Sequence, residues 1–359
     1  MQNNSLKLQP IAIGSLPYSN TQEAMKLVAK DFSNIPFFPQ LAKVSKNEDM
    51  IIQFLEGMPS FFGSKAENFY FDSEDDKFWL DVEDLFTDYE EIITGSNFEK
   101  LDKYAISDNF SSTFSLFEKQ IKTTKPPYAK GQIIGPFTLG VSLTDKDGKC
   151  AIYDETLKDI IVKLLSLKAV WQINRIKQAN PQTIPIIFLD EPCISQLGTS
   201  AYMTIPNEEV IQMLNEVAML IKYFGGICGV HCCGKCDWSI PISAGFDIIN
   251  PDAFNYAQNF SIYSSKINKF LNSGGKIAWG IIPTLNIQAL ETLTTNDLAE
   301  IFEKSVKYLT KKGIDEKLIK DNSLITSSCG AGSLSVEQAK RAMDFINELA
   351  GLLKERYKI

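Results

Sequence analysis

From residue 129 onwards, short apolar runs alternate with longer amphipathic stretches along the chain. The runs are apolar along nearly their whole length, and the amphipathic stretches repeat their apolar residues with helical spacing. A strand that is apolar on both faces is typical of a parallel sheet covered by helices on each side. The pattern predicts strands in 129–139, 184–192, 227–233, 246–250, 276–282 and 324–326, and helices over 155–178, 207–224, 260–272, 296–312 and 336–357.

Two earlier apolar runs, near residues 12 and 36, bring the number of predicted strands to eight. Asn20 with Glu23 predicts the start of a helix that extends to about Phe32 between these two runs. Eight strands, most of them separated by a helix, predict a TIM (β/α)8 barrel, with a doubly wound sheet as the alternative. We expect residues 1–359 to form one barrel domain.

Residues 58–128 interrupt this alternation and are interpreted as an inserted α/β segment that follows the second strand and packs on the barrel. Residues 68–72 and 77–82 alternate apolar and polar positions around an acidic turn, which predicts a β-hairpin. Acidic and aromatic helical segments are expected to follow it, up to about Lys122.

Polar residues gather where the predicted strands end. In a barrel of parallel strands, the carboxyl ends of the strands form the face that carries the active site. The polar residues at these ends, and so the candidates for the site, are Ser15, Lys43, Thr138, Asp190, Glu191, His231, Cys233, Asp252, Thr284 (after Pro283) and Cys329.

His231 is the only histidine of the chain, and it lies two residues before Cys233 at the end of a predicted strand. Residues i and i+2 of a strand face the same side, so both side chains can reach one ion. Zinc binds imidazole and thiolate together and usually has four ligands. We therefore expect Cys329, at the end of another strand, to be the third ligand, and Asp252, at the end of the strand after His231, to be the fourth. The alternatives are a buried cysteine cluster beside a hydrogen-bonded histidine, and an aspartate at 252 that caps a turn.

Several classes of function are excluded by composition and by missing motifs. A net charge of −8 does not favour nucleic acid or an anionic membrane surface as a partner. The chain contains neither a G-x-x-x-x-G-K-[ST] motif nor a G-x-G-x-x-G motif after a strand, so binding of nucleotide phosphates through these motifs is excluded. Seven cysteines, without a signal peptide or a long apolar segment, predict a soluble cytoplasmic protein.

Five short motifs occur in the order found in the catalytic C-terminal half of cobalamin-independent methionine synthase. The resemblance extends from Ile13 to the final helix and places the chain within the wider superfamily of uroporphyrinogen decarboxylase and the corrinoid-dependent methyltransferases. The motifs are Ile13-Gly-Ser-Leu-Pro17, Gly135-Pro-Phe-Thr138, Leu189-Asp-Glu-Pro192, His231-Cys-Cys233 and Ser328-Cys-Gly330.

This resemblance implies a barrel enzyme in which zinc activates a thiol that accepts a methyl group. It implies that His231, Cys233, Cys329 and a carboxylate hold the zinc, although the family's carboxylate is a glutamate and Asp252 stands in its place here. It also implies that Ser15 binds the carboxylate of the acceptor and that Asp190 binds its amino group.

The chain departs from methionine synthase in three respects. It resembles the shorter, core-type enzymes, for which the expected methyl donor is a corrinoid carried by a partner protein, with a methyl-folate as the alternative. Lys43 occupies the position of a glutamate that helps to hold homocysteine, and a lysine there favours an anionic group on the acceptor. Residues 58–128 have no counterpart in the family. The alternative functions are a decarboxylase-like lyase and a non-catalytic zinc protein that serves a corrinoid partner.

Overall fold

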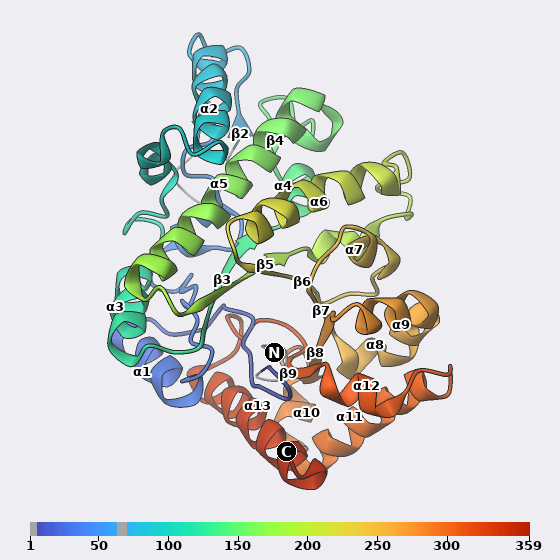
Figure 1. Cartoon of the computed structure of the whole chain (residues 1–359). Coiled ribbons are helices and arrows are strands. Elements are labelled where there is room, and N and C mark those ends of the chain that lie inside the picture. The colour runs from blue at the N-terminus through green and yellow to red at the C-terminus, as the bar shows by residue number, and fades with distance from the viewer. Residues whose placement is uncertain (1–5, 63–69) are drawn as a thin grey trace.

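A six-stranded parallel sheet forms the centre of the computed structural model, which describes residues 6–62 and 70–359 (Figure 1). Each strand pairs in parallel with the strand that precedes it in this sheet along the chain. The order across the sheet is β3 (Tyr128–Ile134), β5 (Ile184–Asp190), β6 (Ile227–Cys232), β7 (Ile248–Pro251), β8 (Lys276–Ile282) and β9 (Ser323–Ser327). All six were predicted from their apolar runs.

The prediction of a closed eight-stranded barrel is wrong. The runs near residues 12 and 36 do not form strands, and their β-pairing with each other and with the sheet consists of the isolated bridges Pro10–Ile325, Ser15–Gln40 and Phe37–Lys130 rather than a continuous ladder. Prolines at positions 10, 17, 36 and 39 provide the physical reason, because a proline has no N–H with which to continue a ladder. The described residues therefore form an open sheet. Its strand order follows the chain without the reversal that a doubly wound fold requires.

Helices lie around the outside of this curved sheet (Figure 1). Several begin at a side chain that caps them: Asn20 accepts from the backbone N–H groups of Gln22 and Glu23, and Ser335 forms a capping box with Gln338. The helices are α1 (Thr21–Asp31), α4 (Pro136–Ser142), α5 (Glu155–Ala179), α6 (Asn207–Tyr223), α7 (Ser239–Ser243), α8 (Ala253–Phe260), α9 (Ser264–Asn272), α10 (Ile287–Thr292), α11 (Thr295–Thr310), α12 (Glu316–Asp321) and α13 (Val336–Tyr357).

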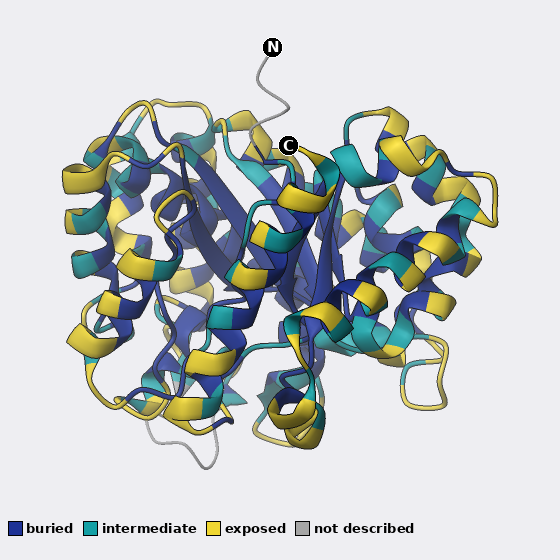
Figure 2. Ribbon diagram, turned by 90° about the horizontal axis from the view of Figure 1, so that it is seen from below, coloured by how far each residue is buried: buried dark blue, intermediate teal, exposed yellow. Residues whose placement is uncertain are grey.

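The strands of the sheet are buried, as their dark blue colour in Figure 2 shows, and their two faces belong to different apolar clusters. The outer face packs against the helices in one large apolar cluster. The inner face carries a smaller cluster that includes Phe188, Ile248 and Leu324. Because side chains alternate along a strand, the residue two positions further on each strand also faces inward. Asp190, Asn250 and Thr326 therefore follow this apolar layer toward the carboxyl ends of the strands.

Within 58–128, the predicted hairpin is wrong in its second strand, because residues 78–82 begin a helix. The short strands β1 (Phe61–Phe62) and β2 (Tyr70–Phe71) are antiparallel, and β2 pairs with β4 (Thr144–Asp145). Residues 68 and 69 of the predicted first strand lie outside the described residues. Helix α2 (Phe78–Ile93) buries Phe78, Val82 and Leu85 on one face, a spacing of three to four residues that outweighs the short alternation. Helix α3 (Phe114–Thr124) follows.

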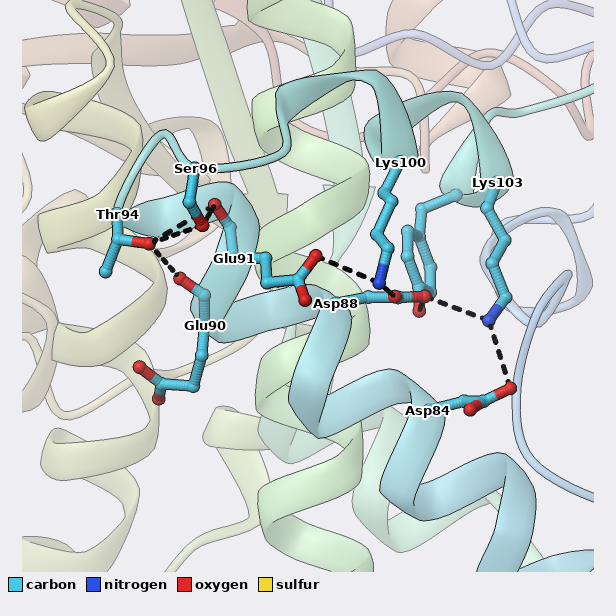
Figure 3. A network of polar contacts seen from close by, with 9 residues as sticks. Asp84, Asp88, Glu90, Glu91, Thr94, Ser96, Lys100 and Lys103 are labelled. Carbon is cyan, nitrogen blue, oxygen red and sulfur yellow. Dashed lines mark hydrogen bonds and ion pairs between the residues drawn. The ribbon is translucent and has the colours of Figure 1, made fainter.

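A network of charges fixes α2 against the 3₁₀ helix η3 (Phe98–Tyr104), as Figure 3 shows. The carboxylate of Asp88 has a side-chain exposure of 6% and accepts hydrogen bonds from Lys103 at 2.9 Å and from the hydroxyl of Tyr104 at 2.8 Å. Lys100 lies 2.7 Å from its other oxygen. Burial alone would raise the pKa of Asp88, but these hydrogen bonds outweigh burial and hold its pKa below the ordinary value.

Among the described residues, we find no helix with the length and apolar character needed to cross a membrane.

Candidate metal centre

Strand β6 directs His231 and Cys233 toward the carboxyl end of the sheet. His231 is 3% exposed on the inner face, and Cys233 follows the last strand residue, half-buried. Cys232 lies between them and faces the opposite side, where its sulfur is 3.9 Å from the carbonyl oxygen of Pro192. Gly229 leaves space beneath the histidine: a Cβ there would lie 2.3 Å from the ring of Phe188.

Cys329 is held at the same end of the sheet by its backbone. Its N–H donates to the hydroxyl of Thr284 at 3.0 Å, and its carbonyl oxygen accepts from that hydroxyl at 2.9 Å and from Ser327 at 2.7 Å. Thr284 follows β8, so the chain after β8 positions a cysteine that follows β9. The thiol of Cys329 is half-buried.

His231, Cys233 and Cys329 meet at one point, with their ligand atoms all within 4.8 Å of one another. Both ring nitrogens of His231 are buried, and neither makes a hydrogen bond of ordinary geometry within the described part of the chain. A buried imidazole in that state, beside two sulfur atoms, is a donor set that suits a borderline-soft metal ion. This group can hold a metal ion, and it brings together three of the four predicted ligands.

The three side chains differ in their protonation when no metal is bound. The pKa of Cys233 is lowered, because the thiol of Cys329 donates to its sulfur and His231 lies close to it. The pKa of Cys329 is raised by the same contact and by burial. Burial alone would lower the pKa of His231, but the nearby sulfur of Cys233 and the charge of Asp190 raise it to about 9. The cluster is therefore one thiolate, one thiol and one imidazolium at neutral pH.

Asp252 lies next to this group but is not a member of it. It is the N-cap of α8, and its carboxylate accepts from the backbone N–H of Asn255 at 3.0 Å and from the side-chain amide of Asn255 at 2.7 Å. Burial raises its pKa to about 6. The structure thus gives Asp252 the capping role that the sequence left open, and its role as a fourth ligand stays a prediction.

Asp190 ends β5 directly beside His231, its partner in the parallel register between β5 and β6. The carboxylate is 6% exposed, and its Oδ1 atom is buried without a hydrogen-bond partner among the described residues. Burial is the main cause that raises its pKa. An unsatisfied buried carboxylate oxygen is costly, and a donor from a bound molecule would satisfy it.

Ser15 and Lys43 both contact the loop that follows Cys329. The carbonyl oxygen of Ser15 accepts from the N–H of Ala331 at 3.0 Å, and its hydroxyl accepts from the N–H of Gly332 at 3.4 Å. The ammonium group of exposed Lys43 donates to the carbonyl oxygen of Leu334 at 3.3 Å. The structure therefore places both residues beside the loop of one cysteine ligand.

Thr138 and Glu191 bind each other. Glu191 is fully buried, and its carboxylate accepts from the N–H of Phe137 at 2.9 Å and from the N–H and hydroxyl of Thr138 at 2.9 and 2.6 Å. Burial raises the pKa of Glu191 to about 7, although these hydrogen bonds oppose that shift. The pair fastens the start of α4 to the end of β5, so its oxygens are largely occupied within the protein.

Three inward-facing polar residues near the site were not predicted. The side-chain oxygens of Asn250 and Thr326 are buried without a hydrogen-bond partner among the described residues. Lys130 is fully buried, with its ammonium group bonded to the carbonyl oxygen of Ile13, and burial lowers its pKa to about 8. The signal that could have found them is strand alternation, since each lies two residues after an inward apolar residue.

The chain matches no protein-family model and no curated protein.

Proposed function

We propose that the protein is a zinc-dependent methyltransferase that transfers a methyl group to a thiol acceptor, either homocysteine or a related thiol. The observation that carries this proposal is the convergence of His231, Cys233 and Cys329 within 4.8 Å at the carboxyl end of the sheet. One imidazole and two thiols from the protein leave a position for a further ligand around a tetrahedral ion. Zinc bound there would lower the pKa of an incoming thiol, so that it reacts as a thiolate at neutral pH.

The surrounding residues suit the binding of a small polar acceptor. The free oxygen of Asp190 is available to an ammonium group, and this contact would satisfy a buried acceptor that is otherwise unpaired. Ser15 and Lys43 lie by the loop of Cys329, where they would hold the acidic end of the acceptor. These three contacts would keep the sulfur of the acceptor in reacting geometry, which is a large source of rate enhancement.

The methyl donor must approach from the open side of the cluster. Cys233 and Cys329 are half-buried rather than enclosed, so the site is accessible at the ends of the strands. We propose a methyl-corrinoid, carried by a partner protein, as the donor, with a methyl-folate as the alternative.

We further propose a cytoplasmic location, because all seven cysteines are free, as is usual in a reducing compartment.

The proposal is tested by metal analysis followed by a methyl-transfer assay. The protein would be purified without chelator, its zinc content measured, and the product followed after incubation with methylcobalamin and either homocysteine or coenzyme M. We expect Cys329→Ala to lose both zinc and activity, whereas Cys150→Ala, at a half-buried cysteine outside the cluster, should lose neither. Zinc retained in full by Cys329→Ala would overturn the proposal. Porphyrin binding without methyl transfer would favour a lyase instead.

Lys43→Glu tests the acceptor. The ammonium group of Lys43 favours an acceptor with an additional anionic group, and a carboxylate would favour an ammonium group. We expect the variant to shift its preference from coenzyme M toward homocysteine while its zinc content stays the same. An unchanged ratio of kcat/KM for the two thiols would exclude Lys43 from acceptor binding.

A further inference from the structure

A second candidate site lies at the opposite end of the sheet from the metal cluster. A cavity of about 1000 Å³ opens at the amino ends of the strands, and the first residues of five neighbouring strands line it: Tyr128, Ile184, Ile227, Ile248 and Lys276. His231, Cys233 and Cys329 lie at the carboxyl ends, so this cavity shares no residue with the site described above. Its volume is at the upper end of the range that is common for small-molecule pockets, roughly 300–1,000 Å³.

Positive charge is concentrated around this cavity, although the protein as a whole has a net charge of −8. Its lining contains four lysines and a single carboxylate, Asp247. Lys222 forms an ion pair with Asp247 at 3.1 Å, which neutralises one charge of each sign. Lys266 and Lys269 are exposed cations of the lining, whereas Lys276 is buried and donates to the side-chain oxygen of Asn322 at 3.2 Å.

The helix dipole explains the positions of only some of these lysines. Lysines are favoured in the last turn of a helix, where Lys222 and Lys269 lie on α6 and α9. Lys266 lies instead in the first turn of α9, where the dipole disfavours a cation, and its hydrogen-bond partner is the neutral hydroxyl of Ser243 at 3.2 Å.

Lys266 and Lys269 form a pair aimed at the same space. They are three residues apart on α9, so they share a face of the helix, and both are exposed and line the cavity. The side-chain ammonium group of Lys269 makes no hydrogen bond or ion pair with any residue that the structure describes. Two like charges at this spacing repel each other, and an anion bound between them would remove that repulsion.

The rest of the lining is apolar. Ile184, Ile227, Ile242, Phe246 and Phe270 contribute aliphatic and aromatic surface beside the lysines. Gly245 and Gly274 also line the cavity and have φ values of +85° and +94°, so no side chain fills the cavity at these positions. A ligand that matches this lining has an apolar body and an anionic group.

We propose that this cavity binds an organic phosphate, with its phosphate group between Lys266 and Lys269 and its apolar or aromatic body against the isoleucines and phenylalanines. Lysine donors suit phosphate, and the apolar wall sets an organic phosphate apart from the inorganic ion. This site does not depend on the methyltransferase proposal, because no residue is shared.

The test measures binding of 1-naphthyl phosphate by isothermal titration calorimetry, with 1-naphthol and inorganic phosphate as separate arms. We expect saturable binding of 1-naphthyl phosphate, and binding at least about tenfold weaker for each of the other two, since each lacks one of the two contacts. No saturation with 1-naphthyl phosphate up to about 5 mM would overturn the proposal, as would equal affinity for 1-naphthol. Equal affinity for inorganic phosphate would overturn the assigned role of the apolar wall.

A matched pair of variants locates the site. Lys266→Met with Lys269→Met should weaken binding of 1-naphthyl phosphate by at least about tenfold. Lys304→Met with Lys307→Met makes the same change at two exposed lysines with the same spacing on α11, and it should bind as the wild type does. Equal affinity in both variants would place the ligand elsewhere. Zinc content and circular dichroism, unchanged in both, would confirm that each variant is folded.

Discussion

At the scale of single residues, the protons held by His231 and Cys329 control metal binding. The pKa of His231 is about 9 and that of Cys329 is raised, so both are protonated at pH 7, whereas the lowered pKa of Cys233 leaves it a thiolate. Metal ligands must be deprotonated, so two protons leave when the ion binds. We therefore predict that zinc affinity rises by about a hundredfold for each pH unit between pH 6 and 8. Competition with a chromophoric chelator at several pH values measures this slope.

Asp252→Asn provides the control for this slope. The pKa of Asp252 is about 6, so its carboxylate is mostly ionised at pH 7 and contributes little to proton release. The variant should keep the two-proton slope, whether or not its absolute affinity falls. A slope near zero in the wild type would contradict the proton assignment, and a large loss of affinity in Asp252→Asn would support a fourth ligand.

The residue-scale predictions succeeded where backbone geometry alone decides the outcome. Alternation in a strand places His231 and Cys233 together, and the shared edge of a parallel sheet adds Cys329. Asp252 is different, because the same carboxylate can cap a helix or bind an ion, and the choice depends on Asn255. Sequence patterns do not rank such competing partners. The contacts of Thr284 with Cys329 were missed for the same reason.

At the scale of elements, the junction between α2 and η3 depends on Asp88. We predict that Asp88→Asn lowers the free energy of unfolding at pH 7 by about 1–3 kcal/mol, because a nearly buried carboxylate loses hydrogen bonds to charged donors. The folded-state pKa of Asp88 lies below its unfolded value, so this stabilisation is present above the unfolded pKa and is lost as the pH falls through the folded one. The difference between variant and wild type should therefore shrink below about pH 4.

Urea denaturation at pH 7 and at acidic pH measures both effects. Asp84→Asn is the matched control, because its carboxylate is 73% exposed and lies 3.8 Å from Lys103. Exposed ion pairs of that kind contribute little to stability. A loss of stability in Asp84→Asn as large as that in Asp88→Asn would show that general charge, rather than the buried contact, holds the junction.

Elements were predictable where a cap or a long period marks them. The terminal helix 336–357 was predicted with the bounds of α13, because Ser335 and Gln338 signal its start. The strand predicted at 77–82 failed because six residues of alternation compete with a helical period that continues to Tyr89. Helix α8 was not predicted, since it lies between two predicted elements and spans only Ala253–Phe260.

At the scale of the whole molecule, the sequence predicted the parallel order but not where the sheet stops. Apolar runs locate the six strands, yet continuing the ladder through residues 10–17 and 35–40 depends on backbone donors that prolines remove. Segments there still pack against the sheet, as Ile11 and Ile35 in its inner cluster show. Hydrophobicity reports burial, and burial alone does not require a strand.

Metal removal is expected to lower the stability of the whole fold, because the ligands follow two strands that are not neighbours in the sheet. His231 and Cys233 follow β6 and Cys329 follows β9, so a bound ion connects chain segments that β7 and β8 separate. An ion that binds only the folded state stabilises it by mass action, by about 4 kcal/mol at a free concentration of 1,000 times Kd. We predict that a chelator lowers the Tm of metal-loaded protein by several degrees, as measured by calorimetry. Cys329→Ala should show the lower Tm without chelator and no further decrease with it. A Tm of the wild type that is the same with and without chelator would mean that the cluster holds no metal tightly in solution.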